Sequence, residues 1–466
     1  AAAIGGKDSM SGSFLDLDVP PTLISFAVAP IQAGDVITPE FKEAGHPVYL
    51  FQPDGSAQDQ QAAWAEFLRL HRKGKIAAAW AVENGMAEAV MKMSFGNRIG
   101  FKGMSQNSPV WYTSRSGAII AELTEDIGNC HPDGFCGKIG HTVTEPVITI
   151  GTDSASIDEL LSLNEAVLED VYPTRAPAEG DAPVLSCPAF TRPVPKIGVA
   201  KPKVLIPVFP GTNCEYDSAR AAQRAGLETE IFVVGNQSAK DVSASAAAFA
   251  QKLRGSQILF LPGGFSGGDE PDGSGKFITA FLRGPETSEA VMDLLKNRDG
   301  LALGICNGFQ ALIKLGLVPY GEIRDMDETC PTLSFNTIGR HQSKIVNTRV
   351  VSNQSPWLAR VNPGEVYAVP ISHGEGRFLC GTELLQTLAE NGQIATQYAD
   401  LTGQPTMDPD FNPNGSAWAV EGITSPDGRI FGKMGHSERV GPDLYRNVPG
   451  AYDLRLFEAA RDYFSL

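Results

Sequence analysis

The chain has 466 residues, of which 42% are hydrophobic, 20% charged and 8% aromatic, as in globular proteins. This length exceeds what one hydrophobic core usually supports, so two or three domains are expected. The formal net charge of −16 argues against a broad basic surface for nucleic acid or an anionic membrane. Apolar stretches are too short to span a bilayer, and seven scattered cysteines do not resemble a disulfide framework. We therefore expect a cytoplasmic protein without nucleic-acid or membrane partners.

The first 170 residues mix strand and helix patterns. An apolar run over residues 23–29 predicts a buried strand, and apolar residues at helical spacing predict a helix over 85–95. Cys130, His131 and Cys136 are spaced too loosely for a usual zinc knuckle, so structural or free thiols are expected there. The remaining predicted elements are helices over 60–72 and 157–168 and strands over 118–123 and 147–150.

A proline-rich segment follows, and residues 171–200 are predicted to be an extended linker between domains. Beyond it, strand and helix patterns alternate, which predicts an α/β fold with a mostly parallel sheet and helices on both faces. Active sites of such sheets lie at the carboxyl ends of the strands. The predicted strands cover residues 204–209, 228–234, 257–261 and 300–305, and the helices 217–225, 244–253, 275–282 and 289–297.

One predicted strand ends in Gly304-Ile-Cys306-Asn-Gly308. Small residues on both sides of a nucleophile permit a sharp strand-to-helix turn that exposes it. At the amino terminus of the following helix, peptide dipoles are expected to lower the thiol pKa and favour the reactive thiolate. A lone cysteine in an apolar strand is more often a core residue, but the flanking glycines favour catalysis by Cys306.

Two other motifs complete a candidate site. Gly263 and Gly264 follow a predicted strand in a tight turn whose N–H groups can face an oxyanion, although such turns are also common as plain connections. His436 is followed two residues later by Glu438, which offers a general base and a carboxylate to orient it.

In this chain order, the three motifs resemble those of the class I glutamine amidotransferases, which have a flavodoxin-like glutaminase fold. The resemblance implies Cys306 as nucleophile, His436 as base and Glu438 as orienting acid, with oxyanion donors around Gly264 and Asn307. The implied reaction is thiolate attack on the glutamine side-chain amide, release of ammonia and hydrolysis of a glutamyl thioester.

Finer motifs resemble the phosphoribosylformylglycinamidine synthase family, whose members convert formylglycinamide ribonucleotide to its amidine with ATP, Mg²⁺ and glutamine. The stretches that carry the resemblance are Val208-Phe-Pro-Gly-Thr-Asn-Cys-Glu215, Gly264-Phe-Ser-Gly-Gly-Asp-Glu-Pro-Asp-Gly273, Cys306-Asn-Gly-Phe-Gln310, Ile371-Ser-His-Gly-Glu-Gly-Arg377 and Gly5-Gly-Lys-Asp-Ser-Met-Ser11.

The resemblance also implies a domain plan. Residues 1–45 would end an ATP-binding-type synthase subdomain, and residues 46–170 would form an α/β synthase subdomain like that of aminoimidazole ribonucleotide synthetase. Residues 201–466 would be the glutaminase. We expect the active ATP and ribonucleotide site in a synthase region upstream of this chain, and that region as a partner. Glutamine hydrolysis itself would need no cofactor.

Further site residues follow from the same resemblance. Glutamine or the oxyanion would be bound by Gly263, Gly264, Phe265, Asn307, Gln310, Asn213 and His373. His373 is equally compatible with an ordinary loop histidine or with the contact to the synthase region. Lys7 and Asp8 are candidates for binding nucleotide, phosphate or Mg²⁺, although such a pair is often merely solvated.

The chain departs from the family at two places. Residues 82–86 read Val-Glu-Asn-Gly-Met where the family often has an Asp-Gly-Gly metal-holding segment, so no metal ligand is assigned. The family commonly has His-Pro-Glu where this chain has His436-Ser437-Glu438, and serine in place of proline keeps the spacing of base and acid. Two alternatives stay open: a non-catalytic docking module with a latent glutaminase, or a glutaminase that serves another acceptor.

Overall fold

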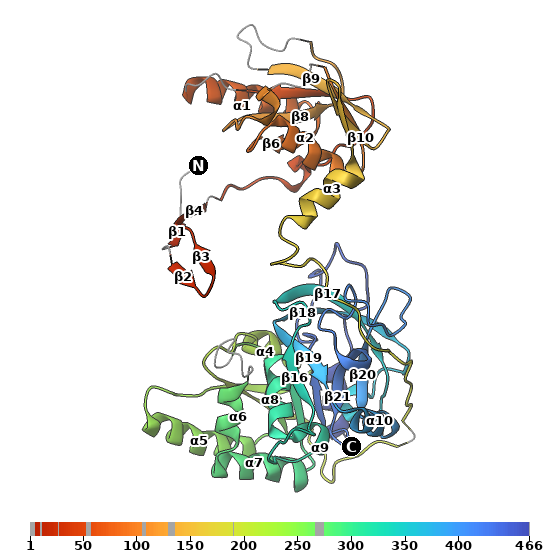
Figure 1. Ribbon diagram of the computed structural model, residues 1–466. Coiled ribbons are helices and arrows are strands. Elements are labelled where there is room, and N and C mark those ends of the chain that lie inside the picture. The colour runs from red at the N-terminus through yellow and green to blue at the C-terminus, as the bar shows by residue number, and fades with distance from the viewer. Residues whose placement is uncertain are drawn as a thin grey trace. The chain divides into compact units, whose positions relative to one another are not determined.

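The computed structural model describes residues 5–9, 12–26, 28–52, 57–104, 109–128, 136–189, 191–265 and 275–465. The chain divides into two compact units, Ala1–Tyr172 and Pro173–Leu466 (Figure 1). Each unit has a hydrophobic core formed by its own residues.

The first unit opens with short antiparallel pairs, β1 (Gly5–Ser9) with β4 (Thr22–Phe26) and β2 (Gly12–Phe14) with β3 (Leu17–Val19). The strand predicted over 23–29 is therefore present in part, but the prediction that it is buried is wrong. Leu23 is 82% exposed and Phe26 is 54% exposed. A two-stranded pair has no second layer of its own against which such side chains could be buried.

The rest of this unit is built on a seven-stranded sheet in the order β11-β10-β7-β9-β5-β8-β6, in which β10 and β7 pair in parallel and the other neighbours are antiparallel. Its strands are β5 (Pro47–Phe51), β6 (Ile76–Ala81), β7 (Gly100–Gly103), β8 (Ile119–Leu123), β9 (Cys136–Val143), β10 (Val147–Ile150) and β11 (Asp153–Ser156). Its helices are η1 (Ala33–Asp35), α1 (Ala57–Arg72), α2 (Met86–Phe95), η2 (Pro109–Tyr112) and α3 (Ile157–Ala166).

Alternation along β5 shows how this sheet is covered. Val48 is buried in one core cluster with Met93 of α2, whereas Tyr49 and Phe51 belong to another cluster with Leu70 of α1. Because successive strand residues face opposite sides, α1 and α2 cover opposite faces of the sheet. The helix predicted over 85–95 is thus confirmed, with its apolar stripe buried.

The second unit begins with residues 173–200, the predicted linker. This segment is extended, but it lies on the unit rather than in solvent. The N–H of Cys187 donates to Val351 O at 2.8 Å, and Gln397 Nε2 donates to Pro183 O at 2.9 Å. The segment is therefore part of this unit's surface.

A nine-stranded sheet in the order β13-β12-β14-β15-β22-β21-β20-β17-β18 forms the centre of the unit. Its strands are β12 (Lys203–Val208), β13 (Glu228–Val233), β14 (Ile258–Leu261), β15 (Leu301–Ile305), β17 (Gln342–Val350), β18 (Val366–His373), β20 (Ile394–Ala399), β21 (Val420–Thr424) and β22 (Ile430–Lys433), and β16 (Thr332–Phe335) pairs separately with β19 (Glu375–Leu379). The helices are α4 (Glu215–Arg224), α5 (Ala239–Arg254), α6 (Lys276–Leu282), α7 (Pro285–Lys296), α8 (Asn307–Leu315), α9 (Leu317–Tyr320), η3 (Pro356–Leu358), α10 (Thr382–Glu390), η4 (Ala417–Ala419) and α11 (Leu456–Phe464).

The sheet is mixed, so the prediction of a mostly parallel sheet holds only for part of it. From β13 to β22 the strands are parallel, and from β22 to β18 they are antiparallel. A short turn joins β21 to β22, and such a turn permits only antiparallel pairing.

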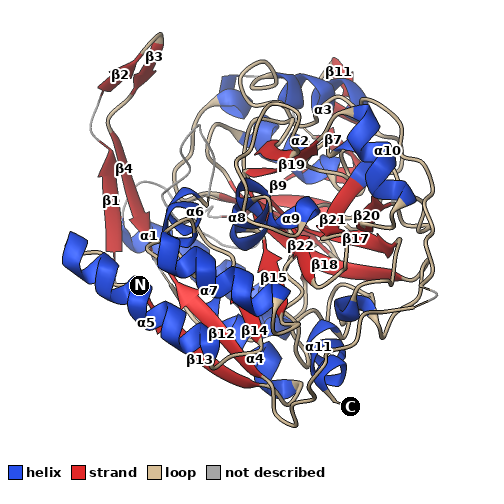
Figure 2. Cartoon of the chain, turned by 90° about the horizontal axis from the view of Figure 1, so that it is seen from below, coloured by secondary structure: helices blue, strands red, loops and turns tan. Residues whose placement is uncertain are grey.

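Helices flank the parallel part (Figure 2). Helix α7 packs against α5 and α6, α6 packs against α8, and α4 lies against β12 and β13 and beside α11. The connections β12-α4-β13 and β13-α5-β14 run in opposite directions along the sheet, so right-handed crossovers place α4 and α5 on opposite faces. The carboxyl ends of β12, β14, β15 and β22 therefore meet at one edge.

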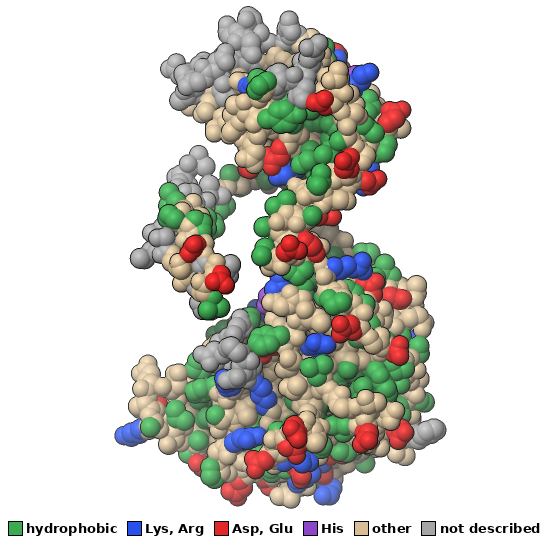
Figure 3. Space-filling view, viewed as in Figure 1, with side chains coloured by type: hydrophobic (Ala, Val, Ile, Leu, Met, Phe, Trp, Pro, Cys, Tyr) green, Lys and Arg blue, Asp and Glu red, His purple; other side chains and the backbone are tan. Residues whose placement is uncertain are grey.

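Charged side chains of both signs are interspersed over the part of the second unit that faces the viewer in Figure 3. Among the residues that the structure describes, none of the helices combines the length and apolar character needed to cross a membrane.

Candidate active site

Cys306 lies at the junction of β15 and α8, where it caps the amino terminus of the helix. Its backbone has φ 52° and ψ −105°, a conformation that non-glycine residues rarely adopt. The N–H of Cys306 donates to Lys433 O at 2.9 Å, which joins the turn to the end of the neighbouring strand β22. The predicted sharp strand-to-helix turn is therefore present, and it is held by the sheet.

Contacts of the two flanking glycines explain the Gly-x-Cys-x-Gly pattern. A Cβ on Gly304 would lie 2.6 Å from Gly308 O, and a Cβ on Gly308 would lie 2.0 Å from Leu261 O. Both distances are too short for any side chain. The pattern thus reflects the close approach of α8 to β14 and β15.

The Cys306 thiol is buried, with 5% of the residue exposed, and Sγ lies 3.8 Å from Ser372 O. Burial raises the pKa of Cys306 to about 12, while the N–H of Asn307 acts in the opposite direction. The prediction that the helix terminus lowers the pKa of Cys306 is therefore wrong. The loss of hydration on burial outweighs the hydrogen bond from the Asn307 N–H.

His436 and Glu438 are both 1% exposed, and His436 Nδ1 lies 2.6 Å from Glu438 Oε1. Among the described residues, the other ring nitrogen, Nε2, has no hydrogen-bond partner. The N–H of His436 donates to Pro370 O at 2.9 Å, two residues before Ser372 on β18. The Cys306 thiol and the His436 backbone thus both contact one short stretch of the edge strand β18.

The predicted oxyanion turn lies against this histidine. A Cβ on Gly263 would be 2.7 Å from His436 Cε1, and Gly264 has φ 149° with its Cβ position 2.5 Å from Gly211 O. Only glycine fits either position. The N–H of Phe265 donates to Gly211 O at 2.8 Å, so this donor is already used within the turn.

Two other candidates have protein partners for their amides. Asn307 Nδ2 donates to Gln310 Oε1 at 3.0 Å, and Gln310 Nε2 donates to Glu375 O at 2.7 Å. Both side chains are buried, and Gln310 joins α8 to β19. This arrangement indicates that they support the shape of the site.

His373 is the last residue of β18 and is 2% exposed. Burial, helped by His436 and His341, lowers its pKa to about 3, so its ring is neutral at physiological pH. Neither ring nitrogen has a partner among the described residues. A buried imidazole with two unused nitrogens is costly, which is typical of a group that meets a ligand.

Cys214 is a site residue that the sequence did not single out, and it caps helix α4. Its Sγ lies 3.9 Å from His436 Nδ1, donates to Asn213 Oδ1 at 3.0 Å and accepts from Arg439 Nη2 at 3.0 Å. The only available signal was its place in the Asn-Cys-Glu stretch after β12.

Atoms of Cys214, His436 and Glu438 lie within 4.8 Å of one another, the spacing of a potential metal site. However, the guanidinium of Arg439 adjoins the thiol, and the imidazole is already bonded to the carboxylate. These contacts disfavour a cation.

The other candidates lie in the first unit. Lys7 and Asp8 are in β1 opposite Ile24 and Leu23, and their side chains lie outside the description. Cys136 is disulfide-bonded, contrary to the expected structural or free thiol. Cys130 and His131 fall outside the described residues.

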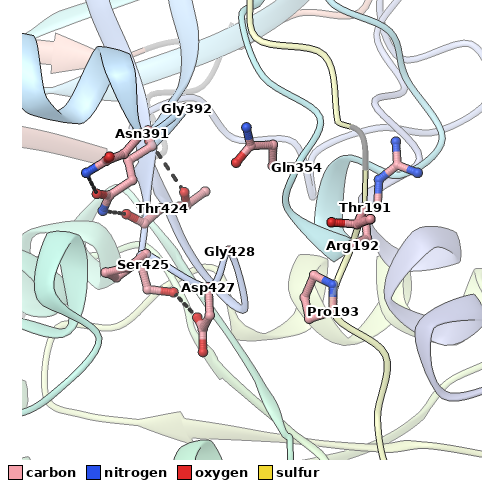
Figure 4. Close-up of a pocket in the computed structure, with 12 residues that line it drawn as sticks. Thr191, Arg192, Pro193, Gln354, Asn391, Gly392, Thr424, Ser425, Asp427 and Gly428 are labelled. Carbon is pink, nitrogen blue, oxygen red and sulfur yellow. Dashed lines mark hydrogen bonds between the residues drawn. The ribbon is translucent and has the colours of Figure 1, made fainter.

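A separate polar pocket of 330 Å³ is shown in Figure 4. It is lined by the turn that joins β21 to β22 and by Thr191, Arg192 and Pro193. This turn precedes β22, whereas Cys306 contacts the end of that strand. The pocket therefore lies at the opposite edge of the sheet from Cys306.

A sequence profile of the CobB/CobQ-like glutamine amidotransferase domains matches residues 201–464. Since the match spans more than half of the chain, the chain belongs to this family of glutamine amidotransferases.

Curated relatives give the particular branch. Phosphoribosylformylglycinamidine synthase subunit PurQ of Methanococcus maripaludis strain S2 is 35% identical over 264 residues, which are 56% of this chain and 89% of that subunit. PurQ of Synechocystis is 35% identical over 245 residues, 52% of this chain and 94% of the relative. The chain therefore carries the glutamine amidotransferase part of a phosphoribosylformylglycinamidine synthase, as the sequence predicted.

Among solved structures, that of PurLQS from Thermotoga maritima is 24% identical, with a TM-score of 0.41. The match covers 56% of this chain and 99% of that one.

Proposed function

We propose that Cys306, His436 and Glu438 hydrolyse glutamine and supply ammonia to phosphoribosylformylglycinamidine synthase in purine biosynthesis. The observation that carries the proposal is that the Cys306 thiol and the backbone of His436, whose ring is bonded to Glu438, contact the same short stretch of β18. His436 Nδ1 is bonded to Glu438 at 2.6 Å, and Nε2 has no partner among the residues that the structure describes, which leaves it available as a general base.

In the proposed reaction, His436 Nε2 takes the proton of the Cys306 thiol as sulfur attacks the carbonyl carbon of the glutamine side chain. Imidazolium then returns the proton to the leaving nitrogen, which departs as ammonia and leaves a glutamyl thioester. Water, deprotonated by the same imidazole, hydrolyses the thioester to glutamate. Because burial holds the pKa of Cys306 near 12, the thiolate forms only as the base removes its proton.

Backbone N–H groups of Gly264 and Asn307 are the proposed oxyanion donors. Phe265 is assigned a packing role because its N–H donates to Gly211 O and therefore does not face the oxyanion. His373 is proposed to bind glutamine through its ring nitrogens, which have no partner within the described part of the chain. Asn213, Gly263 and Gln310 would shape this pocket.

We also propose that residues 1–170 are a synthase part, with residues 1–45 closing an ATP-binding-type subdomain and 46–170 resembling aminoimidazole ribonucleotide synthetase. The Gly-Lys-Asp-Ser motif at residues 6–9 supports this. ATP, Mg²⁺ and formylglycinamide ribonucleotide would serve the amidation in a synthase region, and glutamine hydrolysis would use none of them. The alternative is that residues 1–170 are a docking module.

Glutamate release from glutamine by the full chain, beside Cys306→Ala and the control Cys330→Ala, tests the triad. We expect release by the parent and the control and none by Cys306→Ala. Labelling with a glutamine analogue that carries a chloroketone gives a second readout if turnover needs the synthase region. Modification of another residue, or equal release by Cys306→Ala, would refute the assignment.

A further inference from the structure

A buried ion pair contacts the residue that precedes His436 in the chain. Lys433 and Glu421 have fully buried side chains, and Lys433 Nζ lies 3.0 Å from Glu421 Oε1. Burying two charges carries a desolvation penalty, so such a pair calls for an explanation beyond packing.

Both charges bind the same backbone residue, Gly435. Lys433 Nζ donates to Gly435 O at 2.9 Å, and the Gly435 N–H donates to Glu421 Oε1 at 2.7 Å. The second carboxylate oxygen accepts from the hydroxyl of Thr396 on β20. The ion pair therefore holds both polar groups of the residue that precedes His436.

The turn around His436 contains Gly435 and Ser437, and neither residue fixes the backbone as a proline would. A Cβ at Gly435 would lie 2.7 Å from Val369 Cγ2 and 3.0 Å from Glu421 Oε1. Glycine at 435 therefore leaves room for the Glu421 carboxylate, and the hydrogen bond from the Gly435 N–H to that carboxylate restrains the turn.

Lys433 also contacts the backbone of Cys306. Its carbonyl accepts the N–H of Cys306 at 2.9 Å, and Lys433 is the register neighbour of Ile305 in the paired strands β22 and β15. One residue therefore holds the Cys306 turn through its backbone and the His436 turn through its side chain.

We propose that Lys433 and Glu421 are positioning residues that set the geometry between the Cys306 thiol and the His436 imidazole. The inference rests on the proposed glutaminase function and deepens it. Neither residue touches the reacting atoms, so their removal should lower the rate of the chemical step and leave glutamine affinity largely unchanged.

The test uses the full chain with Glu421→Gln and Lys433→Met combined, because a single change would leave one buried charge unpaired. Glutamine and methionine match the original side chains in size. We expect kcat for glutamine hydrolysis to fall at least about tenfold, with KM within about threefold. The rate constant for Cys306 labelling by the chloroketone analogue should fall in parallel, with its binding constant unchanged.

A matched control removes an ion pair that also binds several backbone carbonyls, but near the amino ends of the parallel strands. Arg298 pairs with Asp293 and donates to Ser256 O at 2.8 Å and to Leu253 O at 2.9 Å. Asp293→Asn with Arg298→Met should lower the unfolding temperature and leave kcat unchanged. Thr396→Val is a second probe. It removes the hydrogen bond to the second oxygen of the Glu421 carboxylate without changing any charge, and it should reduce kcat and leave KM unchanged.

The outcomes separate the two proposals. If Cys306→Ala still releases glutamate, the triad itself is wrong. If Cys306→Ala is inactive or unlabelled while the folded double variant and Thr396→Val keep kcat and the labelling rate within twofold of the parent, the positioning role is overturned. If the double variant does not fold, the kcat and labelling rate of Thr396→Val decide.

Discussion

Replacing Gly308 with alanine tests the turn that presents Cys306. The new Cβ would lie 2.0 Å from Leu261 O and 2.7 Å from Leu261 C, both backbone atoms of a central strand. Relief to 3.0 Å requires α8 and β14 to separate by about 1 Å. Neither element can yield easily, because every residue of β14 is buried.

The size of the effect follows from this overlap. Overpacking of a dense core costs about 1–3 kcal/mol. For a domain of this size, a loss of about 1–3 kcal/mol corresponds to a decrease of roughly 2–12 °C in unfolding temperature. A shift of about 1 Å in the first turn of α8 should also reduce kcat about 10²-fold.

Thermal unfolding and glutamate release, measured on Gly308→Ala and the parent, provide the assay. Gly381→Ala is the matched control, since its Cβ would meet nothing within 4 Å and its φ is −62°. The control should change stability by less than about 1 kcal/mol. An unfolding temperature within 1 °C of the parent with full activity for Gly308→Ala would show that the packing of α8 on β14 is looser than described.

Three other results are expected. His373→Asn should lose less stability than the parent on acidification. In the parent the pKa of His373 is about 3 in the folded state and 6.5 in the unfolded state, so the folded state loses stability as the pH falls from 6.5 toward 3. Between pH 7 and pH 4.5, the free energy of unfolding measured in urea should therefore fall by about 2–3 kcal/mol more in the parent than in His373→Asn. Glu438→Gln should lower kcat about 10²–10⁴-fold because the imidazolium loses its charge partner, and an unchanged kcat in steady-state assays would contradict the triad. Trp357→Ala should lower the free energy of unfolding by about 3–5 kcal/mol. Trp357 is 1% exposed, and its indole Nε1 donates to Arg429 O at 3.1 Å. A loss below about 1 kcal/mol in a urea titration would contradict this expectation.

Features with local causes were predictable from the sequence. Apolar spacing predicted α2, and alternating strand and helix patterns predicted the parallel strands from β12 to β15. The Gly-x-Cys-x-Gly motif predicted a sharp turn at Cys306, because Gly304 is required by the nearby Gly308 carbonyl, whereas the contact of Gly308 with Leu261 could not be read from the sequence. The family and the function followed from such motifs in chain order.

Tertiary structure decided what depends on distant neighbours. Leu23 and Phe26 of β4 are exposed because exposure depends on a covering layer, which an apolar run cannot specify. Burial, not the helix terminus, sets the pKa of Cys306, and the place of Cys214 beside His436 arises only when β12 and β22 end at the same edge. The pairing of Lys433 with Glu421 likewise depends on the register of β21 and β22. Sequence patterns report local steric and hydrophobic preferences, whereas desolvation and charge pairing are set by residues that only folding brings together.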